Sequence, residues 1–552
     1  MKPKIVLLLI IILAAVLRFL YLGAIPVGIT HDEMGYIYNA YSIAKTGRNV
    51  FGELLPVFTW MTRGGFPFMP VPIYSLVPLF WILPLSPAVA RFLPALLGVL
   101  DVLLLYFIVL RMFKHTPLAL LSALFLAISP WHLHFSRSAY DANYALFYFL
   151  LSIAAFLYEL QKKKLPWISA VSMALAMFSY RGMSILFLPI GALLYWFAAT
   201  LRPAISSRQR MGFVAGMILC TLLLGAAVIL NGNGYTKEGM QVFSNPKMQE
   251  ELDTKIREAT GPLSVRRLFT NKPVYILDHL RENYLKSYSP EFLFLYTEPS
   301  AIYSIWSRGR LYFIDLVFVI LGFSFLFRLS KPAALVWTGM LLAGGLPGGI
   351  GGLPYSSRNF FLSAIFPVLS AAGVMHVVSL TKGKLLRTSA IICVTVLYTY
   401  ALGSYLYDYY GRYIPQQAEA WAKSIKEISF LSAQKQKYHD MVFLGKTSFG
   451  DTVEYAFWNR IDPRVVQGTW KNRQEKPFVY FPLDNAVFSE KCLDSADLLK
   501  PMFEKTATIY YITTHTCNNE ATPSGKIEDY FGNPIWKLFE LDRKKPATMM
   551  NL

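Results

Sequence analysis

Apolar residues are grouped into about eleven long runs between residues 5 and 406, which predict membrane-spanning helices. A helix needs roughly 20 apolar residues to cross a hydrocarbon core of about 30 Å. The runs lie at 5–22, 88–112, 117–135, 143–160, 165–180, 182–200, 211–230, 311–328, 333–346, 358–380 and 387–406. This pattern predicts a polytopic α-helical membrane protein, with a transmembrane domain over 1–406.

The remainder of the chain, 407–552, is polar enough to form a soluble domain. It opens with a stretch at 414–429 whose apolar residues are spaced for one face of a helix. Short β-rich runs follow at 441–445, 477–483 and 507–515, separated by polar, turn-rich segments. The alternation predicts a small C-terminal α/β domain.

Basic loops favour one orientation of the spans. With the N-terminus in the cytoplasm, basic clusters fall in inner loops, at 111–115, 161–164, 201–210, 327–331 and 381–387. Counting the apolar, proline-rich stretch 70–85 as a crossing would reverse every later loop, so we interpret it as an interfacial or re-entrant helix. Loops 23–87 and 231–310 and the C-terminal domain are then extracytoplasmic.

Composition supports the membrane assignment and argues against a nucleic-acid partner. Hydrophobic residues make up 54% of the 552 positions and charged residues only 16%, which is too apolar for a soluble protein of this length. The net charge of +19 is explained by the inner loops, so no nucleic-acid partner is expected. Cys492 and Cys517 could pair if the tail faces an oxidising compartment, and no Cys/His cluster suggests structural zinc.

Acidic residues are rare in the first 230 positions, and three of them fall at the outer ends of predicted spans. Asp32 and Glu33 follow the first span, and Asp141 lies in a later outer loop. Charged groups at a membrane are costly unless they face water, a partner or a substrate, so we expect one membrane-proximal cavity. The alternative is that they are solvated loop residues. Neighbouring polar and aromatic residues are candidate substrate contacts: Tyr36, His134, Arg137 and Asn143.

Two arginines on the same predicted side are candidate phosphate ligands. Arg181 and Arg358 each lie at the outer end of a span, and Arg358 follows a glycine-rich segment, 344–352. Arginine binds phosphate through a planar fork of donors and stays charged at a membrane surface. The alternative for either one is contact with lipid headgroups. Asp101, in the middle of a span, is expected to have a structural role.

Several segments resemble a known group of enzymes. The stretch DEMGYIYNAYSIAKTGRNVFGE (32–53) after the first span, and SRSAYDANYALF (136–147) after the third, are similar to polyprenyl-phosphate-sugar-dependent glycosyltransferases of the GT-C superfamily. Segments 283–315 and 358–373 look like stretches found in bacterial members. The nearest groups are the bacterial relatives of dolichyl-phosphate-mannose protein mannosyltransferases and of lipid A aminoarabinose transferases.

The resemblance implies an inverting glycosyltransferase that moves a sugar from a polyprenyl-phosphate carrier to a hydroxyl acceptor at the outer face of the cytoplasmic membrane. It assigns the acceptor's base to Asp32, with Glu33 beside it, and the second-loop acid to Asp141. Carrier phosphate would be bound by Arg358 and Arg181, where SYRG replaces a lysine-containing motif of some relatives. Some members use a divalent metal, which Asp32 and Asp141 would ligate here.

Two other functions remain open from the sequence. A lipid or sugar transporter or flippase would place carboxylates near mid-membrane in two related halves, and no such duplication occurs. A non-catalytic membrane scaffold would tolerate replacement of the loop acids. The sugar and the acceptor, whether envelope lipid, polysaccharide or protein, are left open. No P-loop, nucleophile elbow or HExxH motif supports a hydrolase.

Overall fold

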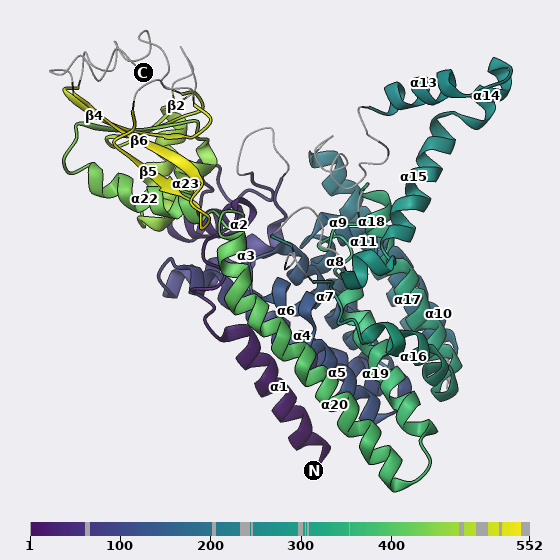
Figure 1. Cartoon of the computed structure of the whole chain (residues 1–552). Coiled ribbons are helices and arrows are strands. Elements are labelled where there is room, and N and C mark those ends of the chain that lie inside the picture. Colours follow the sequence, from purple (N-terminus) through teal and green to yellow (C-terminus); the bar gives the residue numbers. More distant parts are fainter. Residues whose placement is uncertain are drawn as a thin grey trace. The chain divides into compact units, whose positions relative to one another are not determined.

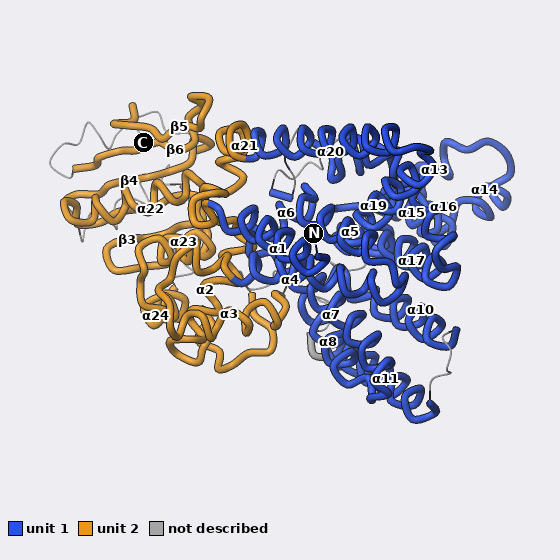
Figure 2. Tube along the Cα trace, turned by 90° about the horizontal axis from the view of Figure 1, so that it is seen from below, with its two compact units in different colours: residues 1–20, 93–409 blue, residues 21–92, 410–552 orange. Residues whose placement is uncertain are grey.

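The computed structural model divides into two compact units. It describes residues 2–60, 67–200, 206–231, 243, 247–295, 302–303, 305, 308–352, 354–473, 480–492, 506–517 and 522–542. Unit 1 comprises 1–20 and 93–409, and unit 2 comprises 21–92 and 410–552 (Figure 2). Unit 1 is helical, and unit 2 combines helices with a β-sheet (Figure 1).

Unit 1 contains the apolar helices. They are α1 (Pro3–Phe19), α4 (Pro87–Phe113, of which the first turns belong to unit 2), α5 (Thr116–Ile128), α6 (Pro130–Ser136), α7 (Asp141–Gln161), α8 (Trp167–Met177), α9 (Arg181–Ser184), α10 (Phe187–Thr200), α11 (Ser207–Asn231), α16 (Asp315–Leu329), α17 (Lys331–Gly344), α18 (Leu346–Ile350), α19 (Leu362–Leu380) and α20 (Lys384–Tyr407). The predicted loop 231–310 adds α13 (Met248–Glu258), α14 (Leu263–Phe269), α15 (Lys272–Lys286) and a π-helix, η2 (Glu291–Leu295). The parts of that loop at 232–242, 244–246 and 296–301 lie outside the described residues.

Nine of the eleven predicted runs each coincide with one helix, and the runs 117–135 and 182–200 each coincide with two, α5–α6 and α9–α10. Among the described residues, seven helices are long and apolar enough to cross a membrane, and there are eight if the bent pair α5–α6 is one span. The pair bends by 59° at Ser129, where Pro130 starts the second helix and lacks the backbone donor that would continue the first. The protein is therefore a multi-pass membrane protein, and the number of eleven crossings stays a prediction.

The stretch 70–85 forms one short helix in unit 2. Helix α3 (Pro70–Ile82) has 13 residues and is about 20 Å long, well short of the roughly 30 Å of a hydrocarbon core. At its end, Trp81 and Ile82 are exposed. A short helix with exposed apolar side chains fits the predicted interfacial position better than a crossing.

Unit 2 is built around a six-stranded mixed sheet. The strands are β1 (Met441–Gly445), β2 (Tyr480–Leu483), β3 (Ala486–Ser489), β4 (Thr508–Thr514), β5 (Gly525–Glu528) and β6 (Pro534–Asp542), in the order β2-β3-β1-β4-β6-β5. β1 pairs in parallel with both β3 and β4, and the other pairs are antiparallel. The C-terminal α/β domain is thus present, and its three predicted β-rich runs correspond to β1, β2 and β4.

The helices of unit 2 correct one expectation. They are α2 (His31–Thr46), α3, α21 (Tyr413–Gln417), α22 (Lys423–Lys435), α23 (Phe449–Trp458) and α24 (Pro463–Lys471), with a π-turn, η3 (Asp408–Arg412), at the junction of the units. The single helix expected over 414–429 is wrong. Its continuity ends between α21 and α22, where Ala422 adopts a left-handed conformation with φ of 54°.

The compact units divide the chain differently from the predicted boundary at 406/407. Residues 21–92 pack with the C-terminal domain because α2 lies against α23 and α24. The Tyr38 hydroxyl donates a hydrogen bond to the Ile461 carbonyl (2.9 Å), and the Gln467 amide donates to the Ser42 hydroxyl (3.0 Å). The acidic segment after the first span is therefore part of the same unit as the tail.

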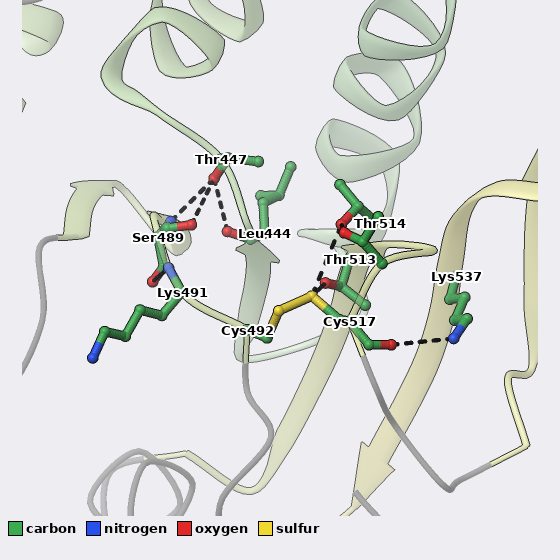
Figure 3. The surroundings of a disulfide bond; sticks show 10 residues. Leu444, Thr447, Ser489, Lys491, Cys492, Thr513, Thr514, Cys517 and Lys537 are labelled. Atoms are coloured by element: carbon green, nitrogen blue, oxygen red, sulfur yellow. Dashed lines mark hydrogen bonds between the residues drawn. A yellow bond between two sulfur atoms is a disulfide. The ribbon is translucent and has the colours of Figure 1, made fainter. Parts of the chain in front are cut away.

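Cys492 and Cys517 form a disulfide beside the ends of β1, β3 and β4 (Figure 3). Their Cα atoms are 5.9 Å apart, and 25 residues separate them in sequence. The carbonyl of Cys517 also accepts a hydrogen bond from Lys537 of β6 (3.2 Å). The pairing that the sequence left open is present, and it joins the segments that follow β3 and β4.

Candidate functional site

The acidic motif of unit 2 starts helix α2. The Thr30 hydroxyl accepts the backbone N–H of Glu33, and the Glu33 carboxylate accepts the backbone N–H of Thr30, which forms a capping box. Such a reciprocal pair satisfies two helix donors that would otherwise lack partners. The sequence therefore fixes the first turn of α2, and with it the backbone position of Asp32.

Glu33 is the centre of a buried ion-pair network. Arg91 donates from Nε to Glu33 Oε1 and from Nη2 to Oε2, both at 3.1 Å, and neither side chain is exposed. Arg91 also donates to the carbonyls of Pro26 (2.9 Å) and Gly28 (2.6 Å), and lies over the Trp421 ring at 5.5 Å. A buried pair is retained only when such extra hydrogen bonds offset desolvation. Glu33 thus fixes the segment that leads into α2.

Asp32 differs from Glu33 in exposure. Its side chain is half-buried at the second position of α2, whereas Glu33 is fully buried. A carboxylate in the first helical turn is stabilised by the helix dipole. Tyr36, one turn later, is buried against Phe68, with ring centroids 4.7 Å apart. Within unit 2, Asp32 is the more exposed member of the acidic pair.

Asp141 occupies the corresponding position in unit 1, at the start of α7. Its Oδ1 accepts the N–H of Ala142 (2.8 Å), and its side chain is half-buried. The preceding residue, Tyr140, packs on Tyr303 with centroids 5.4 Å apart, and Tyr303 contacts Tyr355 at 6.5 Å. This row of tyrosines connects the turn that carries Asp141 to the segment that carries Arg358.

Arginines from three segments gather around the turn 356–358. Arg310 donates from Nε to the Ser356 hydroxyl (2.5 Å), and the Tyr180 hydroxyl donates to the Ser357 hydroxyl (3.2 Å). Arg181, next to Tyr180, is the first residue of α9. We call Arg181, Arg310 and Arg358 the arginine cluster. The three guanidinium groups are at most 7% exposed by residue, so their positions are set by packing.

Local packing orients two members of the cluster. Arg358 donates to the Gly351 carbonyl and lies over the Tyr355 ring at 4.8 Å. A Cβ on Gly351 would approach Arg358 Nε to 2.8 Å, so the absence of a side chain there gives Arg358 its space. Arg310 lies over the Phe292 ring at 3.9 Å and donates to the Phe292 carbonyl (2.7 Å). Hydrogen bonds and ring contacts thus fix the orientation of both guanidinium groups.

Within unit 1, ring contacts link Tyr140, next to Asp141, to Tyr355, and a hydrogen bond links Tyr180, next to Arg181, to Ser357, next to Arg358. Asp32, Glu33 and Tyr36 lie in unit 2. The sequence singled out Arg181 and Arg358 but missed Arg310. The available signal was a pair of arginines, Ser-Arg-Gly-Arg, directly before a predicted span.

Three predicted contact residues make internal hydrogen bonds. Arg137 donates to the carbonyls of Leu17 (2.9 Å) and Arg18 (3.0 Å) at the end of α1. Asn143 donates to the Pro94 carbonyl (2.9 Å), and His134 Nε2 lies 2.7 Å from the Ile302 carbonyl. These contacts position the α6–α7 turn, so Arg137, Asn143 and His134 support the turn that carries Asp141.

Asp101 is part of a second buried charged group. Its Oδ2 lies 3.1 Å from His132 Nε2, and His132 Nδ1 lies 2.8 Å from Arg18 Nη2. Arg18 also donates to the Ala127 carbonyl (3.1 Å), and none of the three side chains is exposed. The expected structural role of Asp101 agrees with these contacts, which tie α1, α4 and α6 together.

The family match lies in the helical half of the chain. Residues 82–233 match the family model described as dolichyl-phosphate-mannose-protein mannosyltransferase. This part of the chain matches a GT-C family. The match includes Arg91, Asp141 and Arg181, and ends before Arg310 and Arg358. Over these residues, the match agrees with the resemblance drawn from the sequence. No curated protein sequence is significantly similar to the chain.

Three solved structures show partial similarity to the chain. Archaeoglobus fulgidus oligosaccharyltransferase AglB, in complex with an inhibitory peptide and a dolichol-phosphate, has 15% identity and a TM-score of 0.48 over 83% of this chain and 63% of AglB. Cupriavidus metallidurans ArnT bound to undecaprenyl phosphate has 11% identity and a TM-score of 0.49 over 96% of this chain and 97% of ArnT. The S. cerevisiae protein O-mannosyltransferase complex bound to the sugar donor has 16% identity and a TM-score of 0.31 over 44% and 36%.

Metal ligation does not follow from the described residues. These contain no group of three or more His, Cys, Asp and Glu side chains that could hold a metal ion. Asp32 and Asp141 each offer the oxygen ligands that hard divalent cations prefer. Ligation of a metal by Asp32 and Asp141 stays a prediction, and no step below is derived through a metal.

Proposed function

We propose that the chain is an inverting glycosyltransferase that moves a sugar from a polyprenyl-phosphate carrier to a hydroxyl acceptor at the outer face of the cytoplasmic membrane. The observation that carries the proposal is the arginine cluster. It lies beside the turn of Asp141, and both Asp141 and Arg181 fall inside the segment that matches the mannosyltransferase family. Buried, oriented guanidinium groups are suited to an anionic leaving group.

Asp32 is proposed as the general base. As the acceptor hydroxyl attacks the anomeric carbon, a new C–O bond forms, the bond from that carbon to the carrier phosphate breaks, and the hydroxyl proton passes to the Asp32 carboxylate. Glu33 and Arg91 act as positioning residues, because they fix the first turn of α2. A single displacement of this kind inverts the anomeric configuration.

The arginine cluster is proposed to stabilise the leaving phosphate. Negative charge grows on the carrier phosphate as its bond to the sugar breaks, and fixed cations in a site of low dielectric stabilise it. Arg358 and Arg181 carry this role, and Arg310 joins them through the Ser356 hydroxyl. Asp141, connected to the cluster by Tyr140 and Tyr303, is proposed to orient the acceptor.

The disulfide supports the proposed orientation. Disulfides persist in oxidising compartments and are rare in the cytosol. The Cys492–Cys517 pair lies in unit 2, whereas Cys220 and Cys393, in helices of unit 1, are free thiols. Positive-inside loops point to the same orientation. Unit 2, with Asp32, is therefore proposed to face the extracytoplasmic side.

The proposal is tested by sugar transfer from a synthetic polyprenyl-phosphate sugar, with the full chain in lipid nanodiscs and a panel of hydroxyl acceptors. Arg358→Gln is expected to lower transfer about 10- to 100-fold, from the loss of charged hydrogen bonds worth about 1.5–3 kcal/mol. The matched control is Arg281→Gln, since Arg281 is 70% exposed on α15 and contacts Asp278. No transfer with any donor, or equal transfer by both variants, would overturn the proposal.

A further inference from the structure

A cavity of about 440 Å³ lies in unit 2, between the loop that follows α2 and the helix α24. It is lined by Phe51, Gly52, Gln467, Gly468, Trp470, Lys471 and Arg473. None of these residues belongs to the acidic motif or to the arginine cluster. Its volume falls within the range of pockets that bind small molecules or parts of larger ones.

The walls of the cavity are fixed by hydrogen bonds and ring contacts. The Gln467 amide donates to the Thr46 hydroxyl (2.9 Å) and the Asn49 carbonyl (3.1 Å) as well as to Ser42. Phe51 packs edge-on against Trp470, with centroids 4.8 Å apart. A site whose lining is fixed before binding loses less conformational entropy when a ligand enters.

The charge of the cavity is positive. Lys471 and Arg473 line it, and the Arg473 guanidinium lies over the Trp470 ring at 4.3 Å and donates to the Trp470 carbonyl (3.2 Å). Cations at the C-terminal end of α24 also complement its helix dipole. The helix dipole accounts for two cations at this end of α24, but it does not account for the cavity that they line. An oriented guanidinium beside an ammonium group fits a carboxylate or a phosphate.

The rest of the lining suits a sugar. Aromatic carbon from Phe51 and Trp470 alternates with the amide of Gln467, and a sugar ring likewise combines apolar C–H faces with polar edges. A Cβ on Gly52 or Gly468 would meet nothing within 4 Å, so both glycines leave open space at the cavity.

We propose that this cavity binds an anionic saccharide segment of the acceptor, with a carboxylate or phosphate group at Lys471 and Arg473. The idea rests on the proposed function, since it names the acceptor's class. Helix α2 connects the two sites. It carries Asp32 in its first turn and Thr46, a partner of Gln467, at its end, 14 residues or about 21 Å along the helix. A chain of several sugar units would reach from the cavity to the base.

Binding can be measured without transfer, with the full chain in detergent. The probes are oligogalacturonate for the carboxylate, a phosphorylated mannan oligosaccharide for the phosphate, a neutral maltooligosaccharide of similar length, and poly-glutamate as an acidic peptide. Gly468→Leu fills the cavity, and Lys471→Gln with Arg473→Gln removes its charge. The matched control is Arg464→Gln, at the start of the same helix and 68% exposed.

We expect an acidic oligosaccharide to bind at least ten times more tightly than the neutral one, and both cavity variants to weaken it at least tenfold, with Arg464→Gln unchanged. Leucine is a better helix former than glycine, so Gly468→Leu should keep the fold, which circular dichroism checks. Preference for poly-glutamate, absence of binding to every probe, or full binding by Gly468→Leu would overturn the inference. Because Asp32→Asn should bind normally while losing transfer, failure of the cavity and failure of the proposed reaction are distinguishable.

Discussion

Each unit contains a fully buried arginine near a buried acid, and the two groups are built differently. In unit 2, Arg91 contacts both oxygens of Glu33 directly. In unit 1, His132 lies between Arg18 and Asp101, so no direct ion pair forms between the two ends. The direct pair fixes the residue next to a half-exposed acid, Asp32, whereas the His-centred group ties helices together inside the membrane domain. The comparison teaches that buried charge near the proposed base has a positioning role, and that buried charge between spans has an architectural one.

Breaking the direct pair is expected to have the largest effect on stability. Arg91→Met leaves the Glu33 carboxylate buried without its cation, and the loss of one partner from a buried pair costs about 3–5 kcal/mol. The measurement is the unfolding midpoint of the purified protein in detergent. The double variant Glu33→Met with Arg91→Met should recover most of the loss, because no unpaired charge remains. A double variant as unstable as the single one would contradict the pairing as the cause.

Reducing the disulfide is expected to have the next largest effect, and to affect unit 2 alone. The bond closes a loop of about 25 residues, for which cross-linking contributes about 3 kcal/mol. Cys492→Ser should lower the unfolding midpoint that reports on unit 2, and dithiothreitol should have the same effect on the wild type. Cys220→Ser, at a free thiol in unit 1, serves as the control. Equal shifts in both variants would contradict the assignment.

Changing the His-centred group is expected to have a smaller effect. Asp101→Asn keeps a polar group that can hydrogen-bond to His132, so the loss should be about 1 kcal/mol, the net value of a hydrogen bond. Asp101→Leu removes the acceptor and should cost more. The unfolding midpoints of both variants are compared with that of Arg91→Met. The comparison tests whether the stability contributed by the group in unit 1 depends less on charge. A loss from Asp101→Asn as large as that from Arg91→Met would remove the distinction.

The smallest expected effect on stability comes from replacing Glu454 on α23. Its Oε2 atom has no hydrogen-bond partner among the described residues. Burial, with a smaller contribution from Asp451, raises the pKa of Glu454 well above its usual 4.5. Above about pH 4.5 the unfolded chain releases a proton that the folded chain keeps, so stability falls as pH rises toward the folded pKa. Glu454→Gln should therefore raise the midpoint at pH 7 and leave it nearly unchanged at pH 4. A lower midpoint at pH 7 would contradict a neutral buried carboxyl.

Much of the fold could be predicted from the sequence, because apolar runs report local helix formation directly. All eleven runs are helices, and β1, β2 and β4 follow from strongly apolar segments. β3 (Ala486–Ser489), β5 (Gly525–Glu528) and the longer β6 were missed, although β2 is no longer than β3 or β5. The packing of residues 21–92 against the tail could not be predicted, because Tyr38 and Ile461 are 423 positions apart.

The residues of the candidate site could be predicted from the sequence, but their burial and contacts could not. Residue types and their positions at helix ends singled out Asp32, Asp141, Arg181 and Arg358. The sequence did not separate the half-buried Asp32 from the fully buried Glu33, because Glu33 is paired with Arg91, 58 positions later. Arg91 had a signal in hindsight, since it is a lone arginine in an apolar helix. The roles of the predicted residues are proposals, and the role of Asp32 is the one tested most directly.

The central claim is that Asp32 removes the acceptor's proton, and its most direct test is initial transfer rate from a polyprenyl-phosphate sugar by Asp32→Asn. The account predicts a loss of about 10²–10⁴-fold in rate, with the unfolding midpoint unchanged, because Asp32 is half-buried and is not the member of the acidic pair that binds Arg91. Asp278→Asn, at an aspartate that is 48% exposed on α15, should keep full activity. Parallel reactions with EDTA show whether a divalent cation takes part. An Asp32→Asn protein that folds normally and transfers sugar at the wild-type rate would contradict the account.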